Sequence, residues 1–150
     1  MNTVTVRAIT PADRESWGET FRGYRDFYEK PHDPEIIDRV WGWLNDPAHE
    51  TRGIAAVQGD RIIGIAHFRT FARPLAGSTG IYLDDLFTTE EARGQGIATE
   101  LLTRLGAIAR DEGASVVRWI TADSNTTARK IYDRVATQTP WVTYDLAPAQ

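Results

Sequence analysis

Residues 84–102, which read DDLFTTEEARGQGIATELL, decide the fold of this chain. An apolar, strand-like run is followed by Arg93, by Gly94 and Gly96, and then by a helix-forming segment. Glycine weakens both strands and helices, so bare backbone at this junction indicates a need for unusual φ angles or for a close approach. A helix N-terminus offers unpaired N–H groups and the positive end of the helix dipole, which suit an anion such as a diphosphate.

Three interpretations of these glycines stay open on the residues alone. A dinucleotide-binding fingerprint needs a third glycine, but GQGIAT carries Thr99 there. A P-loop needs a GK[ST] triplet, and the segment contains no lysine. A flexible turn that binds nothing explains a bare G-x-G equally well.

The rest of the chain surrounds this turn with alternating strands and helices. We expect strands at 3–9, 52–58, 61–71, 78–88, 115–121 and 140–146, and helices at 10–30, 33–46, 94–113 and 125–136. Gly59-Asp60 predicts a hairpin. Strand, glycine turn, helix and strand in the middle imply one parallel pair, while the other connections favour antiparallel pairing. The predicted class is α/β (α+β), with a mixed, mostly antiparallel sheet flanked by helices.

Composition excludes several classes of function. The 150 residues fit a single domain, 1–150, and no apolar run approaches the ~20 residues of a membrane span. The polar N-terminus does not read as a signal peptide, so we expect a cytoplasmic protein without a membrane partner. A net charge of −4 with scattered arginines argues against nucleic acid. The absence of cysteine excludes an acyl-cysteine intermediate, and the three histidines lack metal-ligand spacing, so we assign no metal.

Beyond these inferences, Arg93 to Ala98, RGQGIA, resembles the [QR]-x-x-G-x-[GA] acyl-CoA signature of the GNAT family of N-acetyltransferases. Residues 83–92 look like that family's fourth strand and its turn, and residues 125–136 resemble its second conserved helix. The resemblance covers essentially the whole chain. The segments YLDDLF, FYE and WVTY are most similar to the diamine/polyamine (spermidine/spermine-type) branch.

The resemblance implies a splayed pair of parallel strands with the pantetheine arm of acetyl-CoA in the gap. It implies that main-chain groups near the end of the strand at 78–88 hold the arm, and that the glycine turn holds the diphosphate. For Arg93, stabilising the turn and touching phosphate are equally open. The residues implied to contact acetyl-CoA are Leu86, Phe87, Thr88, Arg93, Gly94, Gln95, Gly96, Ile97, Ala98, Thr99, Asn125 and Ala128.

The resemblance also implies direct acetyl transfer to an amine. An alkylammonium, with a pKa near ~10.4, must lose a proton first, and the leaving thiolate needs an acid. Tyr132 matches the family's general acid, although its helical spacing also fits a core tyrosine. Asp84 matches a carboxylate that holds the amine and passes on its proton. Period-two alternation puts Asp84 with Leu86 on one face and Asp85 on the other.

Further acceptor-site candidates come from the same resemblance, each with a structural alternative. The implied substrate-binding residues are Tyr28, Glu29, Asp84, Asp85 and Trp141. Glu29 could equally be a solvated helix end, Trp141 could serve packing or a dimer contact, and Asp85 taken alone suits an arginine pair. His67, in mid-strand, is expected to be structural rather than catalytic.

The match departs from the branch after Tyr132 and at Arg73, which would repel a dication. The predicted function is therefore acetyl-CoA-dependent N-acetylation of a small primary amine (a diamine, polyamine or amino compound) through a ternary complex. Alternatives are a protein lysine or N-terminal acceptor, or a non-catalytic acyl-CoA sensor. By analogy we also expect a homodimer formed through the C-terminal strand.

Overall fold

The computed structural model describes residues 3–150. The chain forms two compact units, one ending at Ile120 and the other spanning Thr121–Gln150. The first unit contains five strands, β1 (Val4–Ala8), β2 (Arg52–Gln58), β3 (Arg61–Arg73), β4 (Ser78–Thr88) and β5 (Val117–Arg118). Its helices are α1 (Arg14–Phe27), α2 (Pro34–Leu44) and α3 (Ile97–Glu112), with short 3-10 turns at Pro11–Asp13, Pro74–Ala76 and Glu90–Ala92.

The sheet has the order β1-β2-β3-β4-β5. Its first three pairings are antiparallel, and β4 and β5 are parallel, which confirms the predicted mixed sheet. The predicted hairpin is also confirmed, because Gln58 pairs with Arg61 across a turn in which Gly59 has φ +62°. The strand expected at 115–121 is much shorter, since only Val117 and Arg118 pair with β4.

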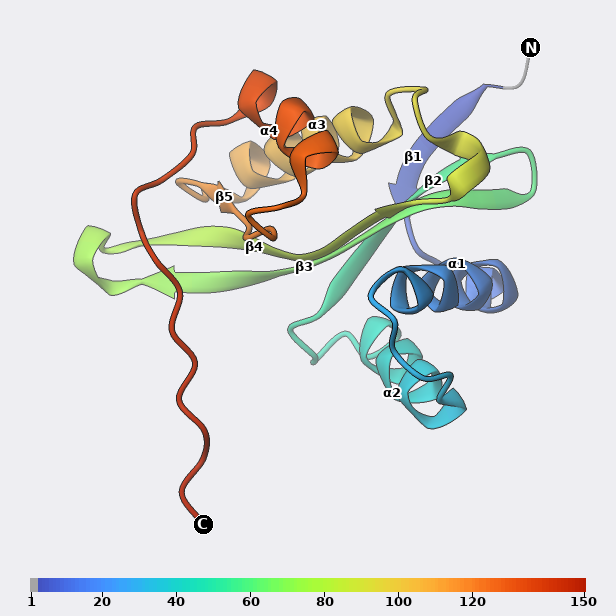
Figure 1. Ribbon diagram of the computed structural model, residues 1–150, viewed down its shortest axis with the longest axis horizontal. Coiled ribbons are helices and arrows are strands. Elements are labelled where there is room, and N and C mark those ends of the chain that lie inside the picture. Colours follow the sequence, from blue (N-terminus) through green and yellow to red (C-terminus); the bar gives the residue numbers. More distant parts are fainter. Residues whose placement is uncertain (1–2) are drawn as a thin grey trace. The chain divides into compact units, whose positions relative to one another are not determined.

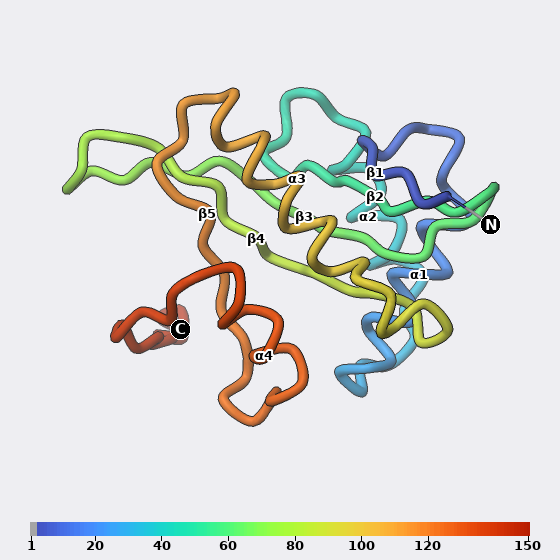
Figure 2. Tube along the Cα trace, turned by 90° about the horizontal axis from the view of Figure 1, so that it is seen from above, coloured from blue at the N-terminus to red at the C-terminus, as the bar shows by residue number. Residues whose placement is uncertain are grey.

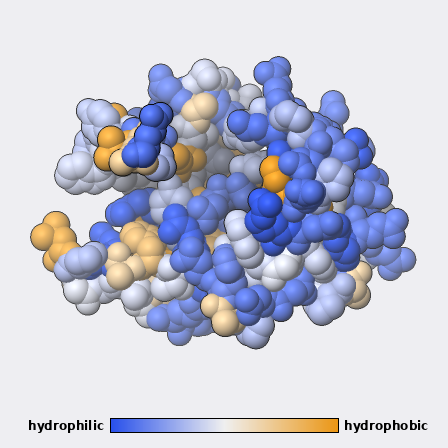
Figure 3. All heavy atoms as spheres, turned by 90° about the horizontal axis from the view of Figure 1, so that it is seen from below, coloured by the Kyte–Doolittle hydropathy of each residue, from blue (hydrophilic) through white to orange (hydrophobic). Residues whose placement is uncertain are grey.

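Helices cover both faces of this sheet. In Figure 1, α1 and α2 lie on one side and α3 lies on the other, and Figure 2 shows α3 running over the strands. Apolar side chains under α1 and α2 form one core cluster. Its buried members are Trp17, Phe21, Ile37, Ala55, Val57, Ile62 and Ile65. Outside this core, the face seen in Figure 3 is mostly hydrophilic, with small hydrophobic groups.

Local signals explain where the helices begin. The Asp13 carboxylate accepts a hydrogen bond from the Thr10 main-chain N–H, so the segment starts as a 3-10 turn before α1 proper. Asp33 caps α2 by accepting from the Glu35 N–H. Gly113, with φ +72°, ends α3 as the sequence predicts.

The second unit contains one helix, α4 (Thr126–Val135), among its residues. The strand expected at 140–146 is absent there, and that prediction was wrong. Alternating apolar residues favour a strand only where a neighbouring strand offers hydrogen bonds, and the segment has no such partner in this unit. No helix of the described chain is long and apolar enough to cross a membrane.

Candidate functional site

The glycine turn before α3 is open to solvent. Gly94 and Gly96 have φ angles of +80° and +77°, a region that residues with a Cβ rarely adopt. A Cβ built on either glycine would find no atom within 4 Å, so the chain itself leaves the turn unobstructed. The turn therefore satisfies two requirements of an anion cradle, namely left-handed backbone and free space.

The N–H groups of this turn are available to a ligand. The first hydrogen bond of α3 runs from the Glu100 N–H to the Gly96 carbonyl, at 3.0 Å. Within the described chain, the main-chain N–H groups of residues 94–99 have no hydrogen-bond acceptor. Six unpaired donors at the positive end of a 16-residue helix form an arrangement that favours a diphosphate.

Arg93 turns its side chain away from these donors. Its guanidinium lies over the rings of Phe27, at 5.6 Å, and Phe87, at 5.7 Å. Its Nε also donates to the Thr88 carbonyl at 3.4 Å. These contacts tie the turn to the end of β4 and to α1, which is the structural one of the two roles that the sequence leaves open.

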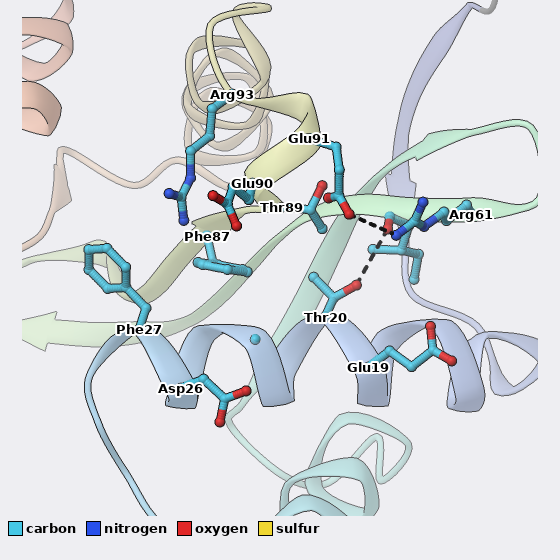
Figure 4. A pocket seen from close by; sticks show the side chains of 12 residues that line it. Glu19, Thr20, Asp26, Phe27, Arg61, Phe87, Thr89, Glu90, Glu91 and Arg93 are labelled. Carbon is cyan, nitrogen blue, oxygen red and sulfur yellow. Dashed lines mark hydrogen bonds and ion pairs between the residues drawn. The ribbon is translucent and has the colours of Figure 1, made fainter.

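A pocket of about 480 Å³ lies beside the turn, between α1 and the ends of β3 and β4. Figure 4 shows Arg93, Phe27 and Phe87 together at one end, and Arg61 and Glu91 in an ion pair elsewhere on its wall. The lining carries four carboxylates and two guanidiniums, those of Glu19, Asp26, Glu90, Glu91, Arg61 and Arg93. This excess of negative charge does not suit a diphosphate, so the glycine turn remains the better anion site.

The outer edge of β4 is not paired with another described strand along its last residues. β5 pairs with β4 only at Ile81 and Tyr82, whereas β4 continues to Thr88. No other described strand pairs with that edge, so the main chain of Leu86, Phe87 and Thr88 lies beyond the parallel pairing. The Phe87 side chain packs against Tyr24 of α1, with ring centroids 5.6 Å apart.

A β-bulge changes how the two aspartates face. His67 pairs with Asp85, but its neighbour Phe68 pairs with Leu83, so Asp84 is an extra residue in β4. Cross-strand partners share a face of the sheet, so the side chains of Leu83 and Asp85 lie on opposite faces. The expectation that these two residues share a face was therefore wrong. Asp84 reaches Arg69, which belongs to the same face of β3 as His67. Both carboxylates therefore lie on the face of the sheet that α1 covers.

Asp84 is partly exposed and paired. Arg69 Nε donates to its Oδ2 at 3.1 Å, and the Arg69 guanidinium lies 4.8 Å from the centre of the Tyr82 ring. Partial burial raises the pKa of Asp84 above its usual value, against the lowering effect of Arg69. The position thus combines a carboxylate with its own counter-ion.

Asp85 has a different environment. His67 Nδ1 lies 2.8 Å from Asp85 Oδ2, and Trp17 Nε1 donates to His67 Nε2 at 3.0 Å. Burial acts to raise the pKa of Asp85, but hydrogen bonds from His67 and Tyr24 outweigh it, so the pKa lies below its usual value. His67 is 1% exposed, which agrees with the expected structural histidine. Its partners Trp17 and Asp85 could not be inferred, because 50 and 18 residues separate them from it.

Tyr28 and Glu29 lie at the end of α1. The Tyr28 ring packs edge-on against Tyr24, with centroids 5.2 Å apart. Glu29 has φ +56°, the only positive φ among the described non-glycine residues. Its N–H donates to the Asp26 carbonyl, and the next N–H donates to the Arg25 carbonyl. This helix ending normally favours glycine, so glutamate here carries a conformational cost.

The second unit holds the remaining candidates. Asn125 occupies the N-cap position of α4, but its side chain donates to Thr121 Oγ1 at 3.3 Å and does not cap the helix. Ala128 and Tyr132 follow at one-turn spacing along α4. Trp141 lies in the extended segment after α4 and is 79% exposed.

Comparison with known proteins identifies relatives of this chain. The family model described as "Acetyltransferase (GNAT) family" matches residues 17–136. A D-amino-acid N-acetyltransferase of Saccharomyces cerevisiae is 30% identical over 144 residues, 94% of this chain and 89% of that protein. A thialysine N-epsilon-acetyltransferase of Bos taurus is 30% identical over 81 residues, 54% of this chain and 47% of that protein. The crystal structure of a probable acetyltransferase shares the fold, with a TM-score of 0.86, 23% identity, and coverage of 97% and 99% of the two chains.

Proposed function

This chain belongs to the acetyltransferase (GNAT) family and is an acetyl-CoA-dependent N-acetyltransferase, and on that premise we propose that its acceptor is the primary amine of a small molecule. The observation that carries the proposal is the bulge in β4, which places Asp84 and Asp85 on one face of the sheet. Two carboxylates there suit an ammonium group, and both relatives above are named for amino compounds.

The acetyl group moves in a single step through a ternary complex. The chain has no cysteine that could carry it as a thioester. The neutral amine attacks the thioester carbonyl carbon and forms the C–N bond, the C–S bond breaks, and the thiolate leaves with the electron pair of that bond. The ammonium loses one proton before attack, the nitrogen loses a second as it becomes an amide, and the thiolate takes up one proton, so one proton is released to solvent overall.

The glycine turn and the β4 edge hold the cosubstrate in this proposal. The unpaired N–H groups of residues 94–99 bind the diphosphate, and the main chain of Leu86, Phe87 and Thr88 pairs with the amides of the pantetheine arm. Arg93 contributes by anchoring the turn to Phe27 and Phe87.

Tyr132 is the proposed general acid. A phenol with a pKa of ~10 stays protonated at neutral pH and can donate to a thiolate. This role requires the two units to work as one domain spanning residues 1–150. The extent of the family match supports that requirement, because residues 17–136 cross the border at Ile120. Asn125 and Ala128 lie on the same segment and are proposed contacts for the cosubstrate.

Within the class of small amines, the charges favour an amino compound that also carries an anionic group. Arg69, Tyr82 and Arg118 are partners in one row across β3, β4 and β5. Arg69 is paired with Asp84, whereas Arg118 lies over the Phe71 ring at 5.5 Å and has no carboxylate partner among residues 3–150. Asp84 and Asp85 would bind the ammonium and Arg118 the carboxylate of an amino acid. The likeness to the diamine/polyamine branch supports the ammonium half of this site.

Tyr28 and Glu29 are the aromatic and acidic wall residues proposed for the acceptor site, and Trp141 stays a prediction from the family resemblance. The strained Glu29 supports this assignment, because unusual backbone conformations concentrate at functional positions. Trp141 also belongs to an exposed apolar segment with Val142, Tyr144 and Leu146. We propose that this segment mediates a homodimer and that the enzyme works in the cytoplasm. Sedimentation that finds only monomer at micromolar concentration would refute the dimer.

Thiol release from acetyl-CoA tests the function. The panel should pair D- and L-amino acids and thialysine with their decarboxylated counterparts, and should add diamines, polyamines and a lysine peptide. We expect release with the small amines and the lowest KM with the amino acids. Release with the peptide alone, or with no acceptor at all, would contradict the proposal.

The same panel tests the anionic half of the site. Arg118→Met should raise the KM for amino acids and leave the KM for their decarboxylated counterparts unchanged. Arg73→Met is the matched control, since that arginine is engaged with Ser115 Oγ at 2.6 Å near the far end of β3. Equal effects of the two substitutions would remove the role of Arg118.

A further inference from the structure

A hydrogen-bonded chain runs from the core to the acceptor face. Trp17 of α1 donates to His67 of β3 at 3.0 Å, and His67 meets Asp85 of β4 at 2.8 Å. Trp17 and His67 are 0% and 1% exposed, whereas the Asp85 side chain is 28% exposed. The row of hydrogen bonds is therefore buried at its indole end and reaches solvent at its carboxylate end.

The direction of these hydrogen bonds fixes the histidine tautomer. An indole N–H can only donate, so Nε2 of His67 must accept and carries no proton. The proton of the neutral ring then lies on Nδ1, which donates to Asp85 Oδ2. A proton on Nε2 would point at the indole N–H, so Trp17 selects against that form. The ring presents Asp85 with a donor and no net charge.

Packing fixes the orientation of the ring as well. The His67 imidazole lies edge-on to Phe21, with centroids 5.2 Å apart, and 5.9 Å from the Trp17 ring. Buried on all sides, His67 has no access to a substrate. It can act only through Asp85, as a positioning residue.

Charge distinguishes the two aspartates. Asp84 is paired with the Arg69 guanidinium, which compensates its charge. The groups that face Asp85 are the neutral His67 from β3, the Tyr24 phenol from α1 and Asp84 on its own strand. Among the described residues Asp85 therefore has no guanidinium or ammonium partner of its own, unlike Asp84, and it lies at the face that α1 covers.

We propose that Trp17 and His67 are positioning residues of the acceptor site, which hold the Asp85 carboxylate in one orientation to receive the ammonium of the substrate. The inference rests on the proposed function, and it gives Asp85 the principal part in binding the amine. Asp84, with its counter-ion, stands beside it.

Two substitutions of His67 separate this role from simple packing. The amide nitrogen of asparagine falls near the position of Nδ1, so His67→Asn can keep the donor to Asp85. The amide of glutamine reaches the position of Nε2, so His67→Gln can keep the contact with Trp17 but not the donor. We expect His67→Gln to raise the KM for the amine on the order of 10- to 100-fold, the effect of losing a hydrogen bond to a charged group. His67→Asn should stay within about threefold of wild type, and the acetyl-CoA KM should not change in either variant.

Nuclear magnetic resonance of the wild-type protein tests the tautomer without any turnover. With only three histidines, the His67 ring nitrogens can be assigned by comparison with His67→Asn. We expect Nδ1 protonated and Nε2 unprotonated at pH 7, and a mixture of tautomers in Trp17→Phe, which removes the indole donor together with part of the buried side-chain volume. A proton on Nε2 in wild type would overturn the inference, even if the variants fail to fold.

The outcomes also separate this inference from the proposed function. Equal amine KM values in the two His67 variants of an active enzyme would refute the positioning role alone. A wild-type enzyme that acetylates no small amine would refute the proposed function, and with it any role of Asp85 in binding such a substrate.

Discussion

Replacing Gly96 with alanine tests whether the turn before α3 binds a diphosphate, because the same helix carries a matched control at its other end. Gly96 and Gly113 flank α3 with φ angles of +77° and +72°, and a Cβ at either position would find no atom within 4 Å. Gly96→Ala and Gly113→Ala thus impose the same backbone strain without a clash. Only the first places a methyl group among the unpaired N–H donors of residues 94–99.

The stability cost should be nearly equal in the two variants. A left-handed alanine costs roughly 1–2 kcal/mol, and the stiffer unfolded chain returns about 0.4–1 kcal/mol. A net loss of about 1 kcal/mol corresponds to a fall in Tm of about 2–4 °C for a chain of this length. Without ligand, both variants should therefore melt a few degrees below wild type and within about 1–2 °C of each other.

Coenzyme A should separate the variants. At 100 times its Kd a ligand stabilises a protein by about 2.7 kcal/mol, and tenfold weaker binding removes ~1.3 kcal/mol of that. Thermal melts with and without coenzyme A, supported by calorimetric titration, should show at least tenfold weaker binding for Gly96→Ala and wild-type affinity for Gly113→Ala. If the two variants bind coenzyme A equally well, the turn does not hold the diphosphate.

Substitutions at three other positions test separate parts of the molecule. Tyr132→Phe should lower kcat on the order of 100-fold or more while coenzyme A still binds; unchanged turnover in a folded variant would remove the general-acid role. Glu29→Gly should raise the free energy of unfolding by about 1 kcal/mol, because it relieves backbone strain, and should also raise the KM for the amine. Glu29→Gln should raise the KM for the amine without any gain in stability. A Glu29→Gly variant with neither effect would contradict both arguments. Hydrogen bonds from Arg7 lower the pKa of Asp13 to about 2, below the unfolded value, so this carboxylate stabilises the fold above pH ~4 and loses that effect as the pH falls through about 2. Asp13→Asn should cost about 2 kcal/mol at pH 7 in urea denaturation, with little difference from wild type near pH 2, and a pH-independent difference would refute the linkage.

The sequence predicts those parts of the structure that depend on neighbouring residues. The Gly59-Asp60 hairpin, the start of a helix at Asp33 and the end of another at Gly113 all rest on contacts within a few positions, and all three are confirmed. The glycine turn was found for the same reason, since its left-handed residues and the helix after it are consecutive.

Features that depend on distant partners were missed. The bulge exists because His67 and Phe68 of β3 pair with residues two apart in β4, which no alternation within one strand can reveal. The contact between Trp17 and His67 spans 50 positions, and a lone histidine in an apolar strand was its only trace in the sequence. The prediction of a closing strand at 140–146 was wrong for a related reason. Its alternating apolar residues suit a strand, but the second unit supplies no neighbouring strand to pair with it.

The edge of β4 that no described strand pairs with has a consequence for handling the protein. A strand whose amides and carbonyls are unpaired is a template, and any extended chain can dock there, including another molecule's misplaced strand. If the pantetheine arm occupies that edge, the cosubstrate shields it as a missing strand would. Stock solutions kept without coenzyme A should then form aggregates sooner than stocks kept with it, by a route that involves no unfolding.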